Sequence, residues 1–191
     1  LVGTPEAVLG TVCVAESERE ATVDNPGALL WSTFLGGSGN DYPHGVVYDP
    51  SGCPIVTGYT QSPNFPTTPG AYDRTHAGSY DVFVAKFAAD GSTLLWATFL
   101  GGGWEDRPFA LVLDGESNPV VAGMTYSPDF PTTPGAYDRT LTGSPDGFVA
   151  KLDATGGSLI WSTFLGGGAF DRVWDLVLDG DDQPIVAGET S

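Results

Sequence analysis

The segment WSTFLGG at Trp31–Gly37 returns as WATFLGG at Trp96–Gly102 and again as WSTFLGG at Trp161–Gly167, so that it recurs about every 65 residues. A second segment, PTTPGAYDRT, is repeated letter for letter at Pro66–Thr75 and Pro131–Thr140. Self-similarity at a fixed period means that each unit is one supersecondary block, which buries its apolar face only by stacking on a neighbour. The sequence therefore predicts a repeat protein.

The repeats divide the chain into a non-repeat N-terminal segment, residues 1–27, and a repeat region, residues 28–191. The repeat region is expected to hold the last strand of a unit at 28–35, two full units at about 36–100 and 101–165, and a partial unit at 166–191. Residues 7–15 read AVLGTVCVA, an apolar, β-prone run without a counterpart in the repeats. We expect this run to form a strand that pairs outside its own unit.

Short apolar runs separated by glycine and proline indicate an all-β protein. Within Thr93–Leu100 both alternating faces are apolar, which is typical of a sheet that is buried on both sides. We therefore expect an all-β, propeller-like array of four-stranded antiparallel sheets with incomplete terminal blades. The expected strands are 28–35, 45–49, 54–60, 81–88, 93–100, 109–114, 119–125, 147–152, 159–165, 174–178 and 184–190.

The charge of the chain excludes two classes of partner. Seven Lys and Arg residues against 24 Asp and Glu residues give a net charge of -17. Nucleic acids and anionic membrane surfaces bind proteins through basic patches, so neither is an expected partner. No apolar run is as long as a bilayer-spanning helix, about 18 residues or more, and we expect no membrane insertion.

The order of four motifs resembles the bacterial SBBP repeat, a family named for seven-bladed β-propellers. These motifs are WSTFLGG, the stretch GNDYPHGVVYDPSGCPIVTGYT that contains Asp41, FPTTPGAYD at Phe65–Asp73 and DVFVAKF at Asp81–Phe87. The resemblance covers about residues 28–191 and implies one propeller-type blade per repeat in a secreted or cell-surface bacterial protein. It implies no catalytic residues, and we expect no enzyme activity.

Closed propellers need about four to eight blades, and this chain holds two full units and parts of others. A half sheet at residues 174–190 would leave backbone groups unpaired, which is a template for another strand. We therefore expect a homo-oligomer or a filament, in which N-terminal strands of one copy complete the C-terminal sheet of the next. The residues expected in this contact are Val8, Leu9, Val12, Val14, Ile185 and Val186.

Two alternatives remain open at this point. The 191 residues are a fragment of a larger closed propeller, or the protein is a propeller module that binds carbohydrate or another protein. Loop aromatics such as Trp104 are platforms on which a glycan ligand can stack.

Repeated aspartates and two cysteines give further candidate sites. Asp41, Asp106 and Asp171 follow the glycines of each WSTFLGG segment, and such carboxylates bind calcium or fix a turn by accepting backbone hydrogen bonds. No other cofactor is expected. Cys13 and Cys53 either form one disulfide or are small core residues. Candidate O-glycosylation sites in the Pro/Thr loops are Thr67, Thr68, Thr132 and Thr133.

Overall fold

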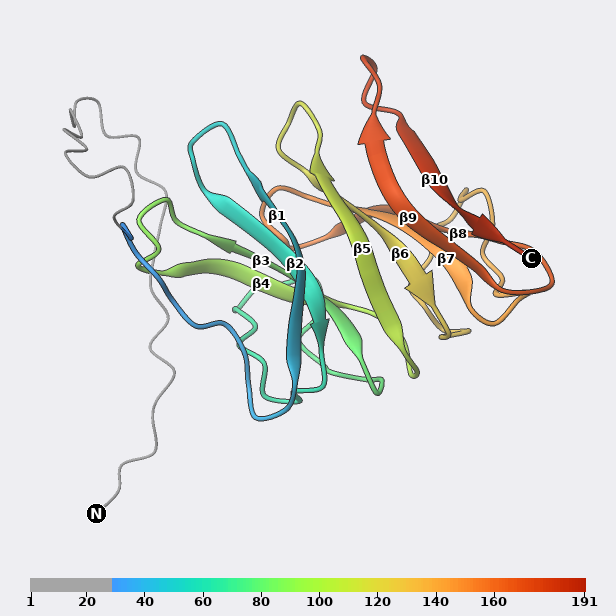
Figure 1. Ribbon diagram of the computed structural model, residues 1–191, viewed down its shortest axis with the longest axis horizontal. Coiled ribbons are helices and arrows are strands. Elements are labelled where there is room, and N and C mark those ends of the chain that lie inside the picture. The colour runs from blue at the N-terminus through green and yellow to red at the C-terminus, as the bar shows by residue number, and fades with distance from the viewer. Residues whose placement is uncertain (1–28) are drawn as a thin grey trace.

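The computed structural model describes residues 29–191, which form ten β-strands (Figure 1). The strands are β1 (Asp41–Tyr48), β2 (Pro54–Thr60), β3 (Asp81–Phe87), β4 (Leu94–Leu100), β5 (Asp106–Leu113), β6 (Pro119–Thr125), β7 (Asp146–Leu152), β8 (Leu159–Leu165), β9 (Asp171–Leu178) and β10 (Pro184–Thr190). The described residues contain no helix, and none of them therefore forms a helix able to span a membrane.

The strands form three antiparallel sheets in chain order. β1 to β4 make the first four-stranded sheet, β5 to β8 make the second, and β9 and β10 make a two-stranded third sheet. The three sheets follow one another along the long axis of the molecule, as Figure 1 shows from blue through green to red. The all-β prediction is confirmed, and so are the antiparallel order and the four strands in each full unit.

The first strand of each unit begins earlier than the sequence predicts. β1, β5 and β9 start at Asp41, Asp106 and Asp171, three residues or more before the expected starts. A β-bulge at His44, Phe109 and Trp174 explains the difference, because each of these residues is skipped in the pairing with the next strand. The extra residue lets the ladder continue past Pro43 and Pro108, which donate no hydrogen bond.

The strand expected at residues 28–35 is not observed, and this prediction is wrong for the described part. Residues 29–35 have no strand assignment, whereas the equivalent β4 and β8 do. β4 pairs with β3 and β8 pairs with β7, but no described strand lies beside residues 29–35. A strand is defined by its pairing, so this segment lacks the neighbour that would make it one.

An aspartate fixes the turn between the first two strands of each unit. Asp49 Oδ1 accepts hydrogen bonds from the backbone N–H groups of Ser51 (2.8 Å) and Cys53 (2.9 Å). Lys86 Nζ on β3 lies 2.8 Å from the other carboxylate oxygen. Burial alone would raise the pKa of Asp49, but the hydrogen bonds from Lys86 and the backbone hold it below its usual range. The lysine therefore ties the turn to the third strand of the sheet.

The second unit repeats this arrangement, and the third has only part of it. Asp114 accepts N–H groups of Glu116 and Asn118 and pairs with Lys151, which is largely buried. Asp179 Oδ1 accepts N–H groups of Asp181 and Gln183, both at 2.9 Å. Residues 179–182 therefore form the hairpin turn between β9 and β10.

Face-to-face packing of sheets builds the core. Ile55, Val84 and Trp96 of the first sheet lie in one buried cluster with Leu111, Phe148 and other residues of the second sheet. Val173 and Leu176 of β9 pack in the same way on the other face of the second sheet. The second sheet is therefore buried on both sides, as the two-sided apolar pattern predicts.

The tryptophan of the repeated segment links each unit to the following one. The Trp96 ring lies against Gly156, in the β7–β8 turn of the next sheet, and Trp96 Nε1 donates to the Ala154 carbonyl at 3.1 Å. Gly156 has φ of +66°, and a Cβ there would collide with the indole ring. Glycine is therefore needed at this turn for two reasons, its backbone angle and the close contact with the ring.

The PTTPGAYD segment covers the outer edge of β4. The Thr68 N–H donates to the Ala97 carbonyl (3.1 Å), and the Phe99 N–H donates to the Asp73 carbonyl (3.0 Å). The same contacts recur beside β8. These bonds occupy backbone groups that would otherwise form an open sheet edge.

Replacing Asp114 with alanine should destabilise the fold more than the same change at Asp179. The Asp114→Ala variant loses the turn and leaves the Lys151 ammonium buried without its partner, and breaking a buried ion pair in this way costs about 3–5 kcal/mol. Asp179→Ala loses only the turn hydrogen bonds, about 1 kcal/mol. Urea unfolding followed by tryptophan fluorescence measures both, and equal losses would contradict the role assigned to the lysine.

Candidate functional site

The third sheet presents an uncovered surface. All seven residues of β10 are exposed, although the equivalent residues of β6 are all buried. Ile185 is 55% exposed, Val186 37% and Val177 of β9 53%. Within residues 29–191, β10 pairs only with β9, whereas β2 and β6 each pair with a strand on both sides. Both predicted assembly residues therefore lie on β10, but only Ile185, opposite Val177, is on the uncovered face; Val186 lies opposite the buried Leu176 on the face toward the second sheet.

The first two sheets show how such residues are covered elsewhere in the chain. Ile55 and Val47 are the equivalents of Ile185 and Val177 in the first unit. Ile55 is fully buried in the cluster between the first two sheets, and Val47 packs against that cluster. Their neighbours from the second sheet are Leu111, Leu113, Val121, Phe148 and Leu152.

The opposite end of the molecule carries a groove lined by the equivalents of these neighbours. The five neighbours just named have equivalents in the first unit, 65 residues earlier. These equivalents are Val46, Tyr48, Val56, Phe83 and Phe87. They line a hollow of about 350 Å³ on the outer face of the first sheet. Val46 is 59% exposed and Tyr48 65% exposed, so this apolar surface is open to solvent.

Residues 31–35 form the second wall of the groove. Trp31, Thr33, Phe34 and Leu35 line it opposite the sheet. The Trp31 ring lies against Gly91, as the Trp96 ring lies against Gly156 in the next unit. Segment 31–35 therefore stands on the first sheet as β4 stands on the second.

The sequence predicted one half of this site and missed the other. Ile185 and Val186 were expected, but Val177 and the groove residues were not. The signal that would have found them is the repeat itself. The residue 65 positions after each of these groove residues lies at the interface between the two full units.

The other predicted assembly residues, Val8, Leu9, Val12 and Val14, lie outside the described residues, and so does Cys13. Cys53 is disulfide-bonded and completely buried. It precedes Pro54, which lines the groove. The pairing of Cys13 with Cys53 stays a prediction.

Asp41, Asp106 and Asp171 each hold a loop in place. Asp106 accepts hydrogen bonds from the Gly102 N–H (2.8 Å), the Ser127 hydroxyl (3.0 Å) and the Thr125 hydroxyl. Asp41 accepts the equivalent bonds, and Asp171 accepts the Gly167 N–H at 2.7 Å. Among residues 29–191, no three His, Cys, Asp or Glu side chains gather in a group suited to a metal ion. The geometry favours the turn-fixing alternative for these aspartates, and the calcium alternative is tested by the experiment given below.

Asp106 lies near a second buried carboxylate, Asp81, at the junction of the first two units. A Cβ on Gly101 would lie 2.7 Å from Asp106 Oδ2 and 3.4 Å from Asp81 Cγ, so the glycine separates the two groups. Burial raises the pKa of Asp106 to about 7, and the nearby Asp81 adds to the rise, against the three hydrogen bonds that lower it. Burial likewise raises the pKa of Asp81. Both aspartates recur in the sequence, at Asp41 and Asp171 and at Asp146, but their approach across the junction of two units is visible only in the structure.

The predicted glycosylation sites differ in their surroundings. The Thr68 hydroxyl accepts the Ala97 N–H, and the Thr133 hydroxyl accepts the Ser162 N–H, both at 3.1 Å. Thr67 and Thr132 are half-buried in the same loops. Modification of these four threonines stays a prediction.

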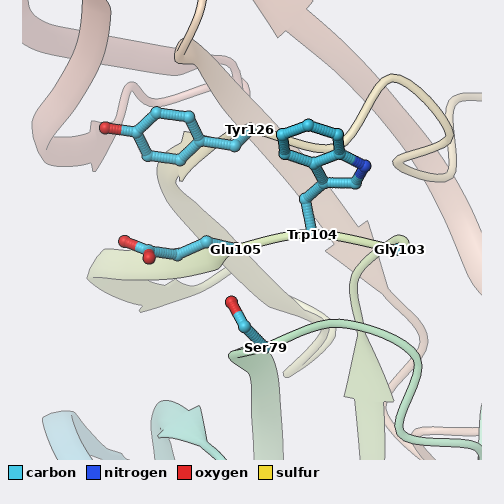
Figure 2. A pocket seen from close by; sticks show the side chains of 5 residues that line it. All are labelled: Ser79, Gly103, Trp104, Glu105 and Tyr126. Atoms are coloured by element: carbon cyan, nitrogen blue, oxygen red, sulfur yellow. The ribbon is translucent and has the colours of Figure 1, made fainter.

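Trp104 lies on the surface between the first and second units. It lines a pocket with Ser79, Gly103, Glu105 and Tyr126 (Figure 2). Neighbouring Arg107 forms an ion pair with Glu105 at 2.8 Å, as Arg172 does with Glu189 at 2.6 Å.

Comparison with known proteins adds no family to these observations. No protein-family model matches the chain, and no curated protein matches it. The resemblance to the SBBP repeat therefore stays an expectation from the sequence.

Addition of calcium should leave the thermal stability unchanged. The oxygens of Asp106 and Asp41 already accept hydrogen bonds from backbone and hydroxyl groups, and a ligand stabilises a fold only if it binds the folded state. Thermal unfolding in 1 mM EDTA and in a millimolar excess of calcium measures this, because calcium at about 100 times its Kd would add about 2.7 kcal/mol to the free energy of unfolding. A clear rise in Tm with calcium, absent with magnesium, would contradict the turn-fixing role.

Replacing Asp106 with asparagine should flatten the pH dependence of stability between about pH 4 and pH 7. The raised pKa means that folded Asp106 holds a proton through this window while the unfolded chain has lost it, so stability falls as pH rises. The effect is on the order of 4 kcal/mol over the shift from 3.8 to about 7. Urea unfolding of both proteins at pH 4 to 8 measures it.

The wild type should lose more stability than Asp106→Asn between pH 5 and pH 8. Parallel pH curves for the two proteins would show that Asp106 ionises normally in the folded state.

Proposed function

We propose that this protein is a non-catalytic structural subunit, exported to the cell surface or secreted, that associates head to tail with further copies of itself. The single observation that carries the proposal is the match between its two ends. The third sheet exposes Val177 and Ile185, whose equivalents in the first unit are Val47 and Ile55. Residues of the second sheet bury Val47 and Ile55, and the equivalents of those residues in the first unit line the groove. Each copy therefore carries both halves of a contact that its own interior already uses.

The chemistry of the contact follows from the internal interface. Leu111, Val121 and Phe148 cover Val47 and Ile55 inside the chain, and Val46, Val56 and Phe83 would cover Val177 and Ile185 between copies. Burying an exposed Val or Ile side chain contributes about 1.5–3 kcal/mol. Apolar side chains on both surfaces also avoid placing like charges directly against each other in the contact, although each chain carries a net charge of -17.

A composite sheet completes the proposal. β9 and β10 of one copy supply the first two strands, and residues 31–35 of the next copy supply the fourth, because they already occupy the position of β4 relative to a sheet. The strand between them is proposed to be residues 7–15, which include Val8, Leu9, Val12 and Val14. A Cys13–Cys53 disulfide would hold this strand beside the groove, next to Pro54.

Such a contact uses a different surface on each partner. Head-to-tail contacts close into a ring if the rotation per copy allows it and otherwise continue as a filament. We propose an open filament of propeller-type blades. The match between the ends also supports a second arrangement, in which further repeats of one longer polypeptide form the same contact, and the experiment below separates the two.

The test uses two variants that each damage one end. Ile185→Asp places a charge on β10, and Val46→Asp places a charge in the groove, both at exposed positions that leave the monomer core intact. Each variant should weaken self-association of the purified protein by at least about tenfold, the effect of losing about 1.4 kcal/mol. Light scattering after gel filtration and electron microscopy of the untreated protein measure this.

Mixing the two variants tests the head-to-tail geometry. The intact third sheet of Val46→Asp fits the intact groove of Ile185→Asp, so the mixture should form dimers that grow no further. Ile160→Asp is the matched control, because Ile160 is 45% exposed on β8, outside both surfaces, and the variant should assemble like the wild type. A wild-type protein that is monomeric at all concentrations would overturn the proposal and leave the single-polypeptide arrangement.

A further inference from the structure

An exposed tryptophan is held on a rigid loop between β4 and β5. Trp104 is 64% exposed. Its backbone N–H donates to the Ser127 hydroxyl at 3.0 Å, and its carbonyl accepts the Ser79 N–H at 2.8 Å. The preceding Gly103 N–H donates to Asp129 Oδ1 at 2.9 Å. The backbone is therefore fixed while the indole faces solvent.

The other two units build the same loop without a tryptophan. Gly39 has the position of Trp104 in the first unit, and its N–H donates to the Ser62 hydroxyl at 2.8 Å. Ala169 has that position in the third unit, and its carbonyl accepts the Ser144 N–H at 3.3 Å. The fold therefore requires only the backbone at this position, and the indole of Trp104 contributes nothing that the loop needs.

Two neighbouring positions depart from the other units at the same junction. Glu105 replaces Asn40 and Phe170 of the other units, and Tyr126 replaces Gln61 and Ser191. Backbone bonds again fix both residues, since the Tyr126 N–H donates to the Glu105 carbonyl at 2.8 Å. Trp104, Glu105 and Tyr126 thus differ together at one place in the molecule.

Together with Ser79 and Gly103, these residues line a shallow pocket of about 310 Å³ that is open to solvent. Figure 2 shows the Tyr126 ring and the Glu105 carboxylate on one side of the pocket and the Trp104 indole on the other, with the Ser79 hydroxyl between them. The volume is at the lower end of small-molecule sites, which range over about 300–1,000 Å³. Apolar rings with a few polar groups around them are the usual composition of such sites.

Charges around the pocket favour a neutral ligand. Glu105 Oε1 lies 2.8 Å from Arg107 Nε, as an ion pair without hydrogen-bond geometry, and the Arg107 guanidinium lies over the Tyr59 ring at 5.0 Å and the Tyr80 ring at 5.2 Å. The arginine is thus held away from the ligand and orients the carboxylate. A net charge of -17 repels anionic ligands.

Backbone geometry weighs against an extended peptide as the ligand. Peptides that add to a protein as a strand need free N–H and C=O groups at an edge. Here the Trp104 N–H and carbonyl and the Ser79 N–H are already engaged within the chain. The pocket offers aromatic faces and side-chain polar groups instead.

We propose that this pocket binds a neutral pyranose unit of an oligosaccharide. The C–H face of the sugar ring stacks on the Trp104 indole, whose π face is negative. The Glu105 carboxylate accepts hydrogen bonds from sugar hydroxyls, and the hydroxyls of Ser79 and Tyr126 are further partners. This binding function goes beyond the self-association proposed above, and none of the five pocket residues lines the groove or belongs to the third sheet.

The test starts from a glycan array that carries neutral hexose and N-acetylhexosamine oligosaccharides beside sialylated and uronic-acid oligosaccharides. The wild-type protein should bind members of the neutral group. Titration of the best neutral oligosaccharide, followed by calorimetry, should then give an affinity that falls at least about tenfold in Trp104→Ala and in Glu105→Gln, as expected for the loss of stacking or of a hydrogen bond to a charged group.

Two comparisons keep the result interpretable. Trp104→Ala should fold normally, because the third unit has alanine at that position, and its unfolding curve checks this. Trp174→Ala is the matched control, since Trp174 is 44% exposed and packs on Phe109 outside the pocket, and it should bind like the wild type. Absence of neutral-glycan binding, binding restricted to anionic glycans, or full affinity in folded Trp104→Ala would overturn the proposal.

Discussion

Each sheet of this protein is apolar on both faces, and the rest of the structure depends on covering both of them. Phe148 and Leu152 on one face of the second sheet are covered by the first sheet, and Val120 and Val149 on the other face are covered by β9. Burial of such faces is the dominant favourable contribution to folding. A sheet at either end of the stack therefore keeps one apolar face that only another sheet can cover. This requirement links the fold to the proposed association between copies.

The strong negative charge of the chain has a structural origin. Many aspartates accept backbone N–H groups in turns and loops, as Asp49, Asp114 and Asp153 do. For these three residues, hydrogen bonds hold the pKa below its usual range although burial alone would raise it. Asp106 differs because its deeper burial outweighs its hydrogen bonds. Asp49, Asp114 and Asp153 therefore stabilise the fold less as pH falls, whereas Asp106 stabilises it less as pH rises.

Positions that vary between units show where the scaffold leaves freedom for function. Residues that hold the units together, such as Trp96 and Gly156, occur at equivalent positions in each unit. The loop at Trp104 keeps its N–H bond at Gly39 in the first unit and its carbonyl bond at Ala169 in the third, while the side chain changes. A repeat protein in this way separates the residues that fold it from those that face a ligand.

The sequence by itself determined the all-β class and the four strands of each full unit, because alternation and turn residues act over short distances. It also made Ile185 and Val186 candidates for a contact between copies, which stays a prediction.

Only the tertiary structure decided the early start of the first strands and the missing strand at residues 29–35, because bulges and strand pairing depend on a partner far away in the chain. The Asp81 and Asp106 pair, the groove at Val46 and Phe83, and the pocket at Trp104 likewise join residues from different strands and loops. Burial and proximity of this kind arise when sheets pack, and a one-dimensional pattern does not contain them.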